Sequence, residues 1–309
     1  MIKSKALKYG DTIAVIAPAG PVSRERVKIG RSALESIGFK VKLGHSCFSS
    51  YGYLSGKDEV RARDVNEMFG DNEVQGIICL RGGYGTTRLL NLIDYENIKS
   101  NPKVFVGYSD ITALHIAFNQ KCGLGTFHGP MVASDMAEGI DHFSRISLVD
   151  AITKTKPLEV IKNPEGELIK SLAPGIAEGE LVGGNLSLIC ASLGTAFEIS
   201  TKGKILFLED IGEKPYKIDR MLIQLLNAGK LQELEGIVLG DWSDCRSDEG
   251  EQSLSLMEVF SDILKPLNIP IIYNIKAGHC YPKLTLPLGV LSRVDGEKCK
   301  LIIKESSLY

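Results

Sequence analysis

Short apolar runs alternate with amphipathic stretches through the first half of the chain. Thr12–Ala17 and Val74–Leu80 are almost wholly apolar, which is typical of buried strands. Asp58–Phe69 carries apolar residues at helical spacing among charges and predicts an amphipathic helix. Another helix is expected to begin after Ser23, a favourable cap, and to end at Gly38. This alternation predicts a parallel sheet with right-handed crossovers and helices on both faces.

The pattern changes in the middle of the chain. Residues 154–177 are polar, contain prolines and show no helical period, so we expect a linker there. A second set of elements follows, including a strand at Ile205–Leu208 and an amphipathic helix at Pro215–Ala228. We therefore expect an amino-terminal α/β domain over residues 1–153 and a smaller carboxyl-terminal domain over residues 178–309.

Composition narrows the class of protein. The 309 residues are 44% apolar and 24% charged, which is ordinary for a globular protein, and the net charge is −2. This charge offers no binding footprint for nucleic acid or an anionic membrane, and no apolar run reaches the roughly 18 residues of a membrane span. The run Ile13–Ala19 is short and broken by Pro18, so it favours a first strand over a secretory signal. Seven cysteines without paired spacing favour a reducing, cytoplasmic compartment.

The stretch Val104–Asp110 places a serine at a sharp junction. Its first three residues end a buried strand, Gly107 follows, and a helical pattern opens at Asp110. Ser109 therefore lies at the carboxyl end of a strand, beside the first N–H groups of a helix, where ligands and oxyanions are favoured. This is the arrangement of a nucleophile elbow, without the second glycine of G-x-S-x-G. A helix cap is the alternative role for this serine.

A nucleophilic serine needs a general base, and the base needs a carboxylate to orient it. Of the five histidines, His279 is favoured because it follows an apolar run within a loop of small residues. His128, at the end of a candidate strand, is an alternative that would line the cleft. Glu209 directly follows an apolar strand, and Asp210 is its rival. Ser109, Glu209 and His279 occur in the chain order of α/β-hydrolases, although triads recur in several orders.

A glycine-rich loop, Arg81-Gly82-Gly83-Tyr84-Gly85, follows the strand expected beside the elbow strand. Its glycines let the backbone approach a substrate, and its N–H groups with that of Asp110 form a candidate oxyanion hole. Arg81 is a candidate partner for a substrate carboxylate, or a tie for the loop. A phosphate-binding loop is the alternative, but G-x-G-x-x-G and G-K-[ST] are absent. Neither H-E-x-x-H nor paired Cys/His spacing occurs, so no metal site is expected.

Five segments together resemble the LD-carboxypeptidase family of serine peptidases, which includes muramoyltetrapeptide carboxypeptidases and microcin C immunity hydrolases. In the family's order they are Gly10–Ala19, Arg81–Gly85, Gly107–Asp110, Leu208–Asp210 and Gly278–His279. The resemblance spans nearly the whole chain. It implies an α/β fold with a parallel-sheet amino-terminal domain (Rossmann- or flavodoxin-like, glutamine-amidotransferase-like), a smaller α/β carboxyl-terminal domain, and an active site between them.

The resemblance also implies site residues. They are a Ser109–His279–Glu209 triad and oxyanion donors at the backbone N–H groups of Gly83 and Asp110. The substrate-binding residues that we expect are Arg81, Gly82 and Tyr108.

The implied reaction removes the terminal D-alanine from a cytoplasmic murein tetrapeptide, as in peptidoglycan recycling, with no cofactor and in a homodimer. A microcin-type aminoacyl-adenylate conjugate hydrolase is the alternative within the family. The carboxyl-terminal half has no evident insertion of the microcin type, which favours the recycling branch. From the residues alone, a nucleotide-binding module remains a further alternative.

Overall fold

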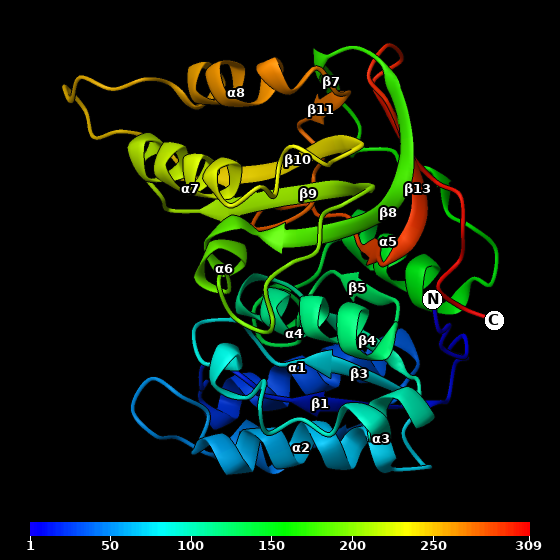
Figure 1. Cartoon of the computed structure of the whole chain (residues 1–309). Helices are drawn as coiled ribbons and strands as arrows, with labels where there is room; N and C mark the ends of the chain where they lie inside the picture. The colour runs from blue at the N-terminus through cyan, green and yellow to red at the C-terminus, as the bar shows by residue number, and fades with distance from the viewer.

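The computed structural model describes all 309 residues, and it contains two β-sheets that lie one above the other in Figure 1. The amino-terminal half forms the lower part in that view and most of the carboxyl-terminal half the upper part. In spatial order, the strands of the first sheet are β12 (Leu286–Leu288), β5 (Thr126–His128), β4 (Val104–Gly107), β3 (Gly76–Cys79), β1 (Thr12–Ile16) and β2 (Lys40–Leu43). β1 to β5 run parallel, and β12 joins the edge of β5 antiparallel. The expected α/β class and parallel sheet are confirmed.

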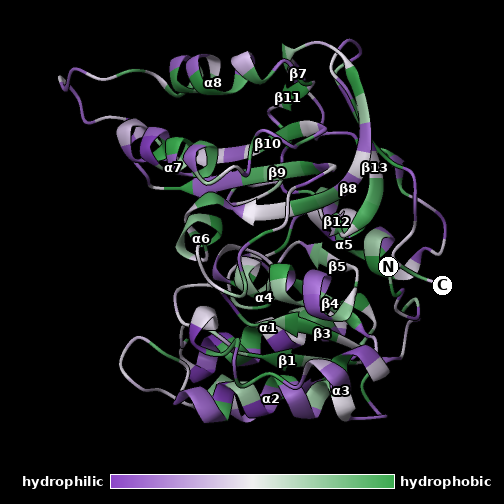
Figure 2. Ribbon diagram, viewed as in Figure 1, coloured by the Kyte–Doolittle hydropathy of each residue, from purple (hydrophilic) through white to green (hydrophobic).

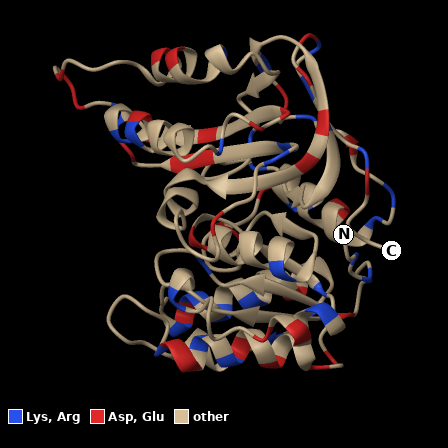
Figure 3. Ribbon diagram, in the orientation of Figure 1, with Lys and Arg blue, Asp and Glu red and all other residues tan.

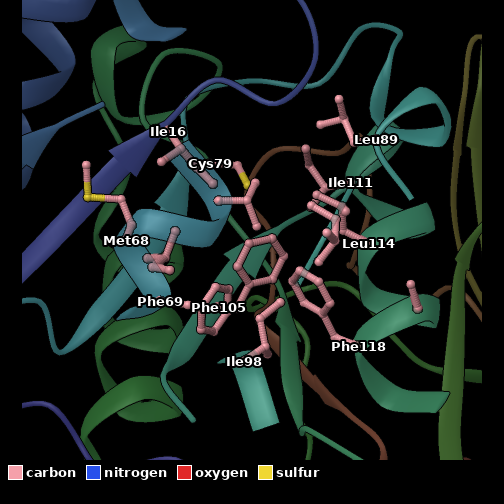
Figure 4. Packing of buried hydrophobic residues seen from close by; sticks show 14 of the residues in the cluster. Ile16, Met68, Phe69, Cys79, Leu89, Ile98, Phe105, Ile111, Leu114 and Phe118 are labelled. Carbon is pink, nitrogen blue, oxygen red and sulfur yellow. The ribbon is translucent and has the colours of Figure 1, made fainter. Parts of the chain in front are cut away.

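Side chains alternate along the strands of this first sheet, so apolar side chains lie on both of its faces. Helices cover both faces and bury them. Phe105 of β4 faces one side, and its neighbours Val104 and Val106 face the other. The helices of the first face are α2 (Asp58–Gly70), α3 (Tyr95–Ser100) and α4 (Thr112–Ala117), and those of the second are α1 (Arg24–Ile37) and α5 (His142–Thr153). On the first face, the rings of Phe69, Phe105 and Phe118 pack with centroids 4.9 to 6.1 Å apart (Figure 4).

The second sheet is mixed. Its strands are, in spatial order, β6 (Glu159–Val160), β14 (Lys300–Ile303), β13 (Val290–Asp295), β8 (Ile176–Asn185), β9 (Lys204–Ile211), β10 (Gly236–Ser243), β11 (Ile271–Tyr273) and β7 (Lys170–Ala173). β8 to β11 run parallel and the others pair antiparallel. The helices against one face are α6 (Leu186–Ala191), α7 (Pro215–Asn227) and α8 (Leu256–Leu264). Figure 2 shows apolar residues along the strands and polar ones on the outer turns of the helices.

Capping residues set several helix boundaries. The Ser23 side chain accepts a hydrogen bond from the Arg26 N–H, and Gly38 adopts a φ of 113° after the last turn of α1. Ser255 and Glu258 form a reciprocal capping box at the start of α8. The remaining short helical turns are His45–Phe48, Thr86–Arg88, Ser109–Ile111, Phe118–Cys122, Met136–Glu138 and Lys265–Leu267.

Some expected local structures differ from those observed. Residues 154–177, expected as a linker, contain β6 and β7 and the start of β8, all of which pair within the second sheet. The segment after the glycine-rich loop forms only the short turn Thr86–Arg88. The extent of the two domains stays a prediction. Charged residues lie along α2 and α7 and on several loops, and acidic residues also lie on β8 and β9 (Figure 3). No helix is both long and apolar enough to cross a bilayer.

The chain termini meet beside the first sheet (Figure 1). The Ala6 N–H donates to the carbonyl oxygen of Tyr309 at 3.1 Å, and Ser4 forms a bridge with Leu308. Together with β12, these contacts bring segments from the two ends of the sequence against the amino-terminal half.

Candidate active site

Ser109 stands on a strained turn at the end of β4. Its φ of 64° lies in the left-handed region, which residues other than glycine rarely adopt. The turn Ser109–Ile111 follows at once and leads into α4. Neither helical segment has a side-chain cap, so the alternative role of Ser109 as a helix cap is wrong. The strand-to-helix turn instead holds the hydroxyl away from the helix and leaves it partly exposed.

The glycine-rich loop lies against this serine. It leaves β3, which pairs directly with β4 as expected. A Cβ on Gly82 would lie 2.8 Å from Ser109 Oγ and 3.5 Å from the Asp110 nitrogen, so glycine alone permits this approach. Gly83 adopts a φ of 119°, which also favours glycine. The hydroxyl, the Asp110 N–H and the loop backbone therefore surround one small space.

The Asp110 side chain joins the loop to the elbow. Its carboxylate accepts a hydrogen bond from the Thr86 N–H at 2.8 Å, and the Thr86 hydroxyl donates to the Asp110 carbonyl oxygen at 2.5 Å. Burial raises the pKa of this carboxyl, and the bonds from Thr86 oppose that rise. The buried guanidinium of Arg61 donates to the Gly85 carbonyl oxygen at 2.9 Å and supports the far end of the loop.

His279 and Glu209 form a hydrogen-bonded pair. The distance from His279 Nδ1 to Glu209 Oε2 is 2.7 Å, and the two side chains are 13% and 0% exposed. An ionised carboxylate only accepts hydrogen bonds, so Nδ1 carries the proton and Nε2 is left as a base. Burial raises the pKa of Glu209, and the hydrogen bond from His279 opposes that rise. Glu209 lies inside β9, which extends further than the sequence pattern indicated.

Gly278 allows this pair to form. It adopts a φ of 117°, and a Cβ there would lie 2.5 Å from Glu209 Oε2. Asp210, the rival carboxylate, has a different function. It accepts hydrogen bonds from Asn185 Nδ2 and from the Ser187 N–H at 2.9 Å each, and so holds the start of α6.

The two halves of the molecule meet at Tyr108, the residue before Ser109. Its ring lies 4.9 Å from the His279 ring, with the planes at 69°. Beside it, Thr112 Oγ1 of α4 accepts a hydrogen bond from the Asn185 N–H at 3.0 Å. The elbow from one sheet and the histidine–glutamate pair from the other therefore face the same interface. An arrangement of this kind suits acyl transfer through an activated serine.

Family models for the LD-carboxypeptidase N-terminal domain and C-terminal domain match residues 13–129 and 178–294. The chain belongs to the LD-carboxypeptidase family. It is 44% identical to a Bacillus subtilis protein named "Probable murein peptide carboxypeptidase", over 97% of this chain and 94% of the relative. It is 29% identical to the murein tetrapeptide carboxypeptidase of Pseudomonas aeruginosa, over 93% of this chain and 94% of that protein. The enzyme is thus a carboxypeptidase of this serine peptidase family, as the sequence motifs predicted.

Solved structures agree with this membership. The microcin C7 self immunity protein MccF superposes with a TM-score of 0.93 at 26% identity, with 100% of each chain covered. The muramoyltetrapeptide carboxypeptidase from Oxalobacter formigenes superposes with a TM-score of 0.83 at 30% identity, covering 95% of this chain and 99% of that one. Both branches named by the sequence resemblance therefore share the two-sheet fold of this family member.

Two aromatic side chains of the enzyme lie deeper than the sequence indicated. Tyr108 is buried and its ring contacts that of His279, and its role in substrate binding stays a prediction. His128, considered as a cleft residue, is buried with both ring nitrogens unpaired, and burial lowers its pKa well below the usual value. The environment of His128 thus favours the neutral imidazole.

Arg81 of the enzyme stays open to solvent. One guanidinium nitrogen lies 3.5 Å from the Pro21 carbonyl oxygen, and the side chain lines a hollow of about 530 Å³ with Ser23, Arg26 and Ser134. This hollow adjoins the carboxyl ends of β1 and β3, where the chain leaves the sheet in opposite directions and where ligands bind in such folds. No group of three or more His, Cys, Asp or Glu side chains is arranged to hold a metal ion.

Among the buried charged residues that sequence reasoning missed, Arg61, Asp135 and Lys283 contact the candidate site or its supporting loop. For Arg61 a signal was available, because it lies four and seven residues before Val65 and Met68 and so shares the apolar face of α2. Asp135 and Lys283 lie in irregular segments far apart in the chain, and no local pattern connects them.

Proposed function

We propose that the enzyme is a serine carboxypeptidase that releases the terminal D-alanine from murein tetrapeptide. The observation that carries this proposal is the buried His279–Glu209 hydrogen bond at the interface where Ser109 occupies a strained turn. The names of its relatives support the substrate class. A role in peptidoglycan recycling follows from that substrate.

In the proposed mechanism, His279 Nε2 accepts the proton of the Ser109 hydroxyl as the oxygen attacks the scissile carbonyl. Glu209 holds the Nδ1 proton and stabilises the imidazolium. His279 then protonates the leaving amine of D-alanine, and water hydrolyses the acyl-enzyme by the same proton transfers in reverse. The buried position of Glu209 strengthens its attraction to the imidazolium because the surroundings screen it weakly.

The oxyanion of the tetrahedral intermediate is assigned to the N–H groups of Gly83 and Asp110. Donors of this kind stabilise charge that develops only in the transition state, and loss of one typically costs about 10²–10³ in turnover. Gly82 keeps the space beside Ser109 open for the substrate carbonyl. Arg81, with its exposed guanidinium, is assigned to a carboxylate of the peptide.

We place the enzyme in the cytoplasm and as a homodimer. All seven cysteines are free and six of them are buried, which suits a compartment that keeps thiols reduced. Light scattering on the purified protein measures the oligomeric state directly, and a mass of one chain would contradict the dimer.

The proposed function is tested by incubating the enzyme with murein tetrapeptide and measuring free D-alanine. Ser109→Ala is expected to stop release while the melting temperature stays the same, because the hydroxyl caps no helix. Ser36→Ala, an exposed serine on α1, is the matched control and is expected to keep full activity. Full activity of the Ser109 variant would show that the nucleophile is wrongly assigned.

A second candidate reaction is hydrolysis of a microcin-type aminoacyl-adenylate conjugate. It is favoured by the full-length superposition with the microcin C7 self immunity protein. Turnover of an aminoacyl sulfamoyl or aminoacyl-adenylate substrate is to be compared with turnover of the tetrapeptide by kcat/KM. A larger kcat/KM for the conjugate would replace the murein peptide as the substrate without changing the proposed triad.

A further inference from the structure

A buried ion pair joins the two halves of the molecule behind the candidate site. Lys283 Nζ and Asp135 Oδ1 are 2.5 Å apart, and their side chains are only 5% and 6% exposed. Lys283 follows β11 in the carboxyl-terminal half, whereas Asp135 lies in the loop after β5 of the first sheet. Asp135 is itself held by the Met131 N–H, which donates to Oδ2 at 2.8 Å.

Tyr108 is the third member of this group. Lys283 Nζ donates to the Tyr108 hydroxyl at 3.0 Å and lies 4.1 Å from the centre of its ring. The hydroxyl in turn lies 3.3 Å from Asp135 Oδ1, to which it donates. The ring of Tyr108 contacts the ring of His279, and its backbone leads directly into Ser109. The ion pair therefore contacts a side chain that touches the candidate base and belongs to the residue directly before the candidate nucleophile.

The loop that carries His279 is attached to the amino-terminal half near the same point. The Leu284 N–H donates to the Lys276 carbonyl oxygen at 2.6 Å and closes the loop on itself. The Lys283 N–H donates to Ser144 Oγ of α5 at 2.8 Å, and the Tyr281 hydroxyl donates to the Gly139 carbonyl oxygen at 2.8 Å. The position of His279 relative to Ser109 thus depends on contacts that cross between the halves.

Stability alone is a poor reason to bury such a pair. Removing two charges from water is costly, and neutral residues of similar size are often equally stable or more stable. A buried pair does, however, fix one geometry, because either charge left alone in the interior is strongly unfavourable. A group that must hold an imidazole within hydrogen-bonding reach of a hydroxyl benefits from such a fixed geometry, since a misplacement of about 1 Å costs about 10² in rate.

We propose that Lys283 and Asp135 are positioning residues, which set the His279 ring against Ser109 by holding Tyr108 and the loop of residues 276–284. This inference rests on the proposed triad. It assigns no contact with substrate to either residue, and it replaces the expected substrate-binding role of Tyr108 with one of support.

The test uses a neutral version of the pair. Lys283→Met alone leaves Asp135 as an unpaired buried charge, so loss of folding is expected and the variant is uninformative by itself. The double variant K283M/D135N removes both charges, and its amide oxygen still accepts from the Met131 N–H. We expect it to fold, as circular dichroism measures, with kcat on murein tetrapeptide reduced about 10²-fold and KM within about twofold of the parent value.

Two further variants complete this test. Lys283→Arg keeps a cation beside Asp135 and is expected to retain most of the parent kcat. K230M/E198Q neutralises a partly buried ion pair with an Nζ–Oε1 distance of 2.8 Å, whose side-chain hydrogen bonds involve neither Tyr108 nor the loop of residues 276–284. It is expected to leave kcat unchanged. A folded K283M/D135N variant with unchanged kcat, or one that loses affinity alone, would overturn the positioning role.

A spectroscopic measurement separates this inference from the proposed function. The Nδ1 proton of His279, bound to Glu209, is expected to give a downfield proton resonance in NMR spectra of the Ser109→Ala protein. K283M/D135N in the same background is expected to shift or broaden that line, and K230M/E198Q is expected to leave it in place. An unchanged line overturns the positioning role, whereas full activity of the Ser109→Ala protein overturns the triad whatever the line does.

Discussion

The two halves of the molecule position their catalytic groups in different ways. The amino-terminal half places Ser109 by backbone geometry, on a turn with positive φ between β4 and α4 and with Gly82 pressed against it. The carboxyl-terminal half places His279 by side-chain contacts, through a bond to buried Glu209 and a ring contact with Tyr108. One half of the candidate site is therefore built locally, whereas the other depends on residues distant in sequence.

The largest expected effect concerns the carboxylate of the second half. Glu209→Gln is expected to lower kcat about 10⁴-fold, because an amide at this position favours the wrong imidazole tautomer. Burial raises the pKa of Glu209, so its charge is unfavourable in the folded state, and the neutral variant is expected to be at least as stable as the parent. Steady-state kinetics and urea unfolding measure the two quantities. A decrease in kcat of less than tenfold would show that Glu209 is not a member of the triad.

Matched glycine substitutions in the two halves compare backbone and side-chain positioning. Gly278→Ala is expected to lower kcat about 10²-fold and to cost about 1–3 kcal/mol of unfolding free energy, because φ is 117° and the new Cβ meets Glu209. Gly82→Ala is expected to lower kcat to a similar degree, at a smaller cost in stability, because its Cβ meets Ser109 but its φ is not positive.

Gly212 provides the control for these two substitutions. Its φ is 70°, but a Cβ there meets nothing within 4 Å. Gly212→Ala is therefore expected to cost stability and leave kcat unchanged. Equal activity of the Gly82, Gly278 and Gly212 variants would show that close backbone approach does not matter in either half.

A pH experiment examines the support beneath the elbow. His115 Nε2 donates to the Gly107 carbonyl oxygen at 2.8 Å, and burial lowers the pKa of this histidine to about 4 from 6.5. Between these values the unfolded chain binds a proton that the native state does not. The contribution of neutral His115 to the free energy of unfolding is therefore fully present above pH 6.5. It falls with decreasing pH, by about 2 kcal/mol between pH 6.5 and pH 5.

His115→Gln keeps a donor for Gly107 but has no titrating ring. Urea unfolding of this variant is expected to show a pH dependence smaller by about that 2 kcal/mol. His128, whose pKa burial also lowers, remains and accounts for part of the residual slope. An unchanged slope would mean that His115 is protonated in the folded protein.

The smallest expected effect concerns substrate binding in the first half. Arg81→Ala is expected to raise KM for murein tetrapeptide about tenfold with little change in kcat, because the assigned interaction is the same in the ground and transition states. Arg81→Lys is expected to recover only part of the affinity, since an ammonium lacks the bidentate fork. Steady-state kinetics on the tetrapeptide measure both effects. An unchanged KM would show that Arg81 does not bind the substrate carboxylate.

The features that could be predicted from the sequence are those formed by residues adjacent in the chain. The boundaries of α1 follow from Ser23 and Gly38, because capping acts within one turn. The elbow at Ser109 was likewise recognisable, since an apolar strand, a glycine and a helical pattern are adjacent in the chain. Such local signals also predicted that the strands of the first sheet run parallel.

Other features depend on long-range pairing and could not be predicted. β6 and β7 are short and polar, and they form strands only because β14 and β11 offer them an edge. The ion pair of Asp135 and Lys283 joins positions without a shared period. Glu209 and Asp210 are adjacent acids after an apolar run, and only the fold around them decides which one meets the imidazole.

The place of β12 at the edge of β5 has a consequence for synthesis on the ribosome. Until residues 286–288 have emerged, β5 has an unpaired edge that offers free N–H and C=O groups to any neighbouring chain. The nascent amino-terminal half is therefore the form most exposed to intermolecular strand pairing. Strong overexpression raises the concentration of such incomplete chains and is expected to yield inclusion bodies. Slower expression at low temperature should recover dispersed protein.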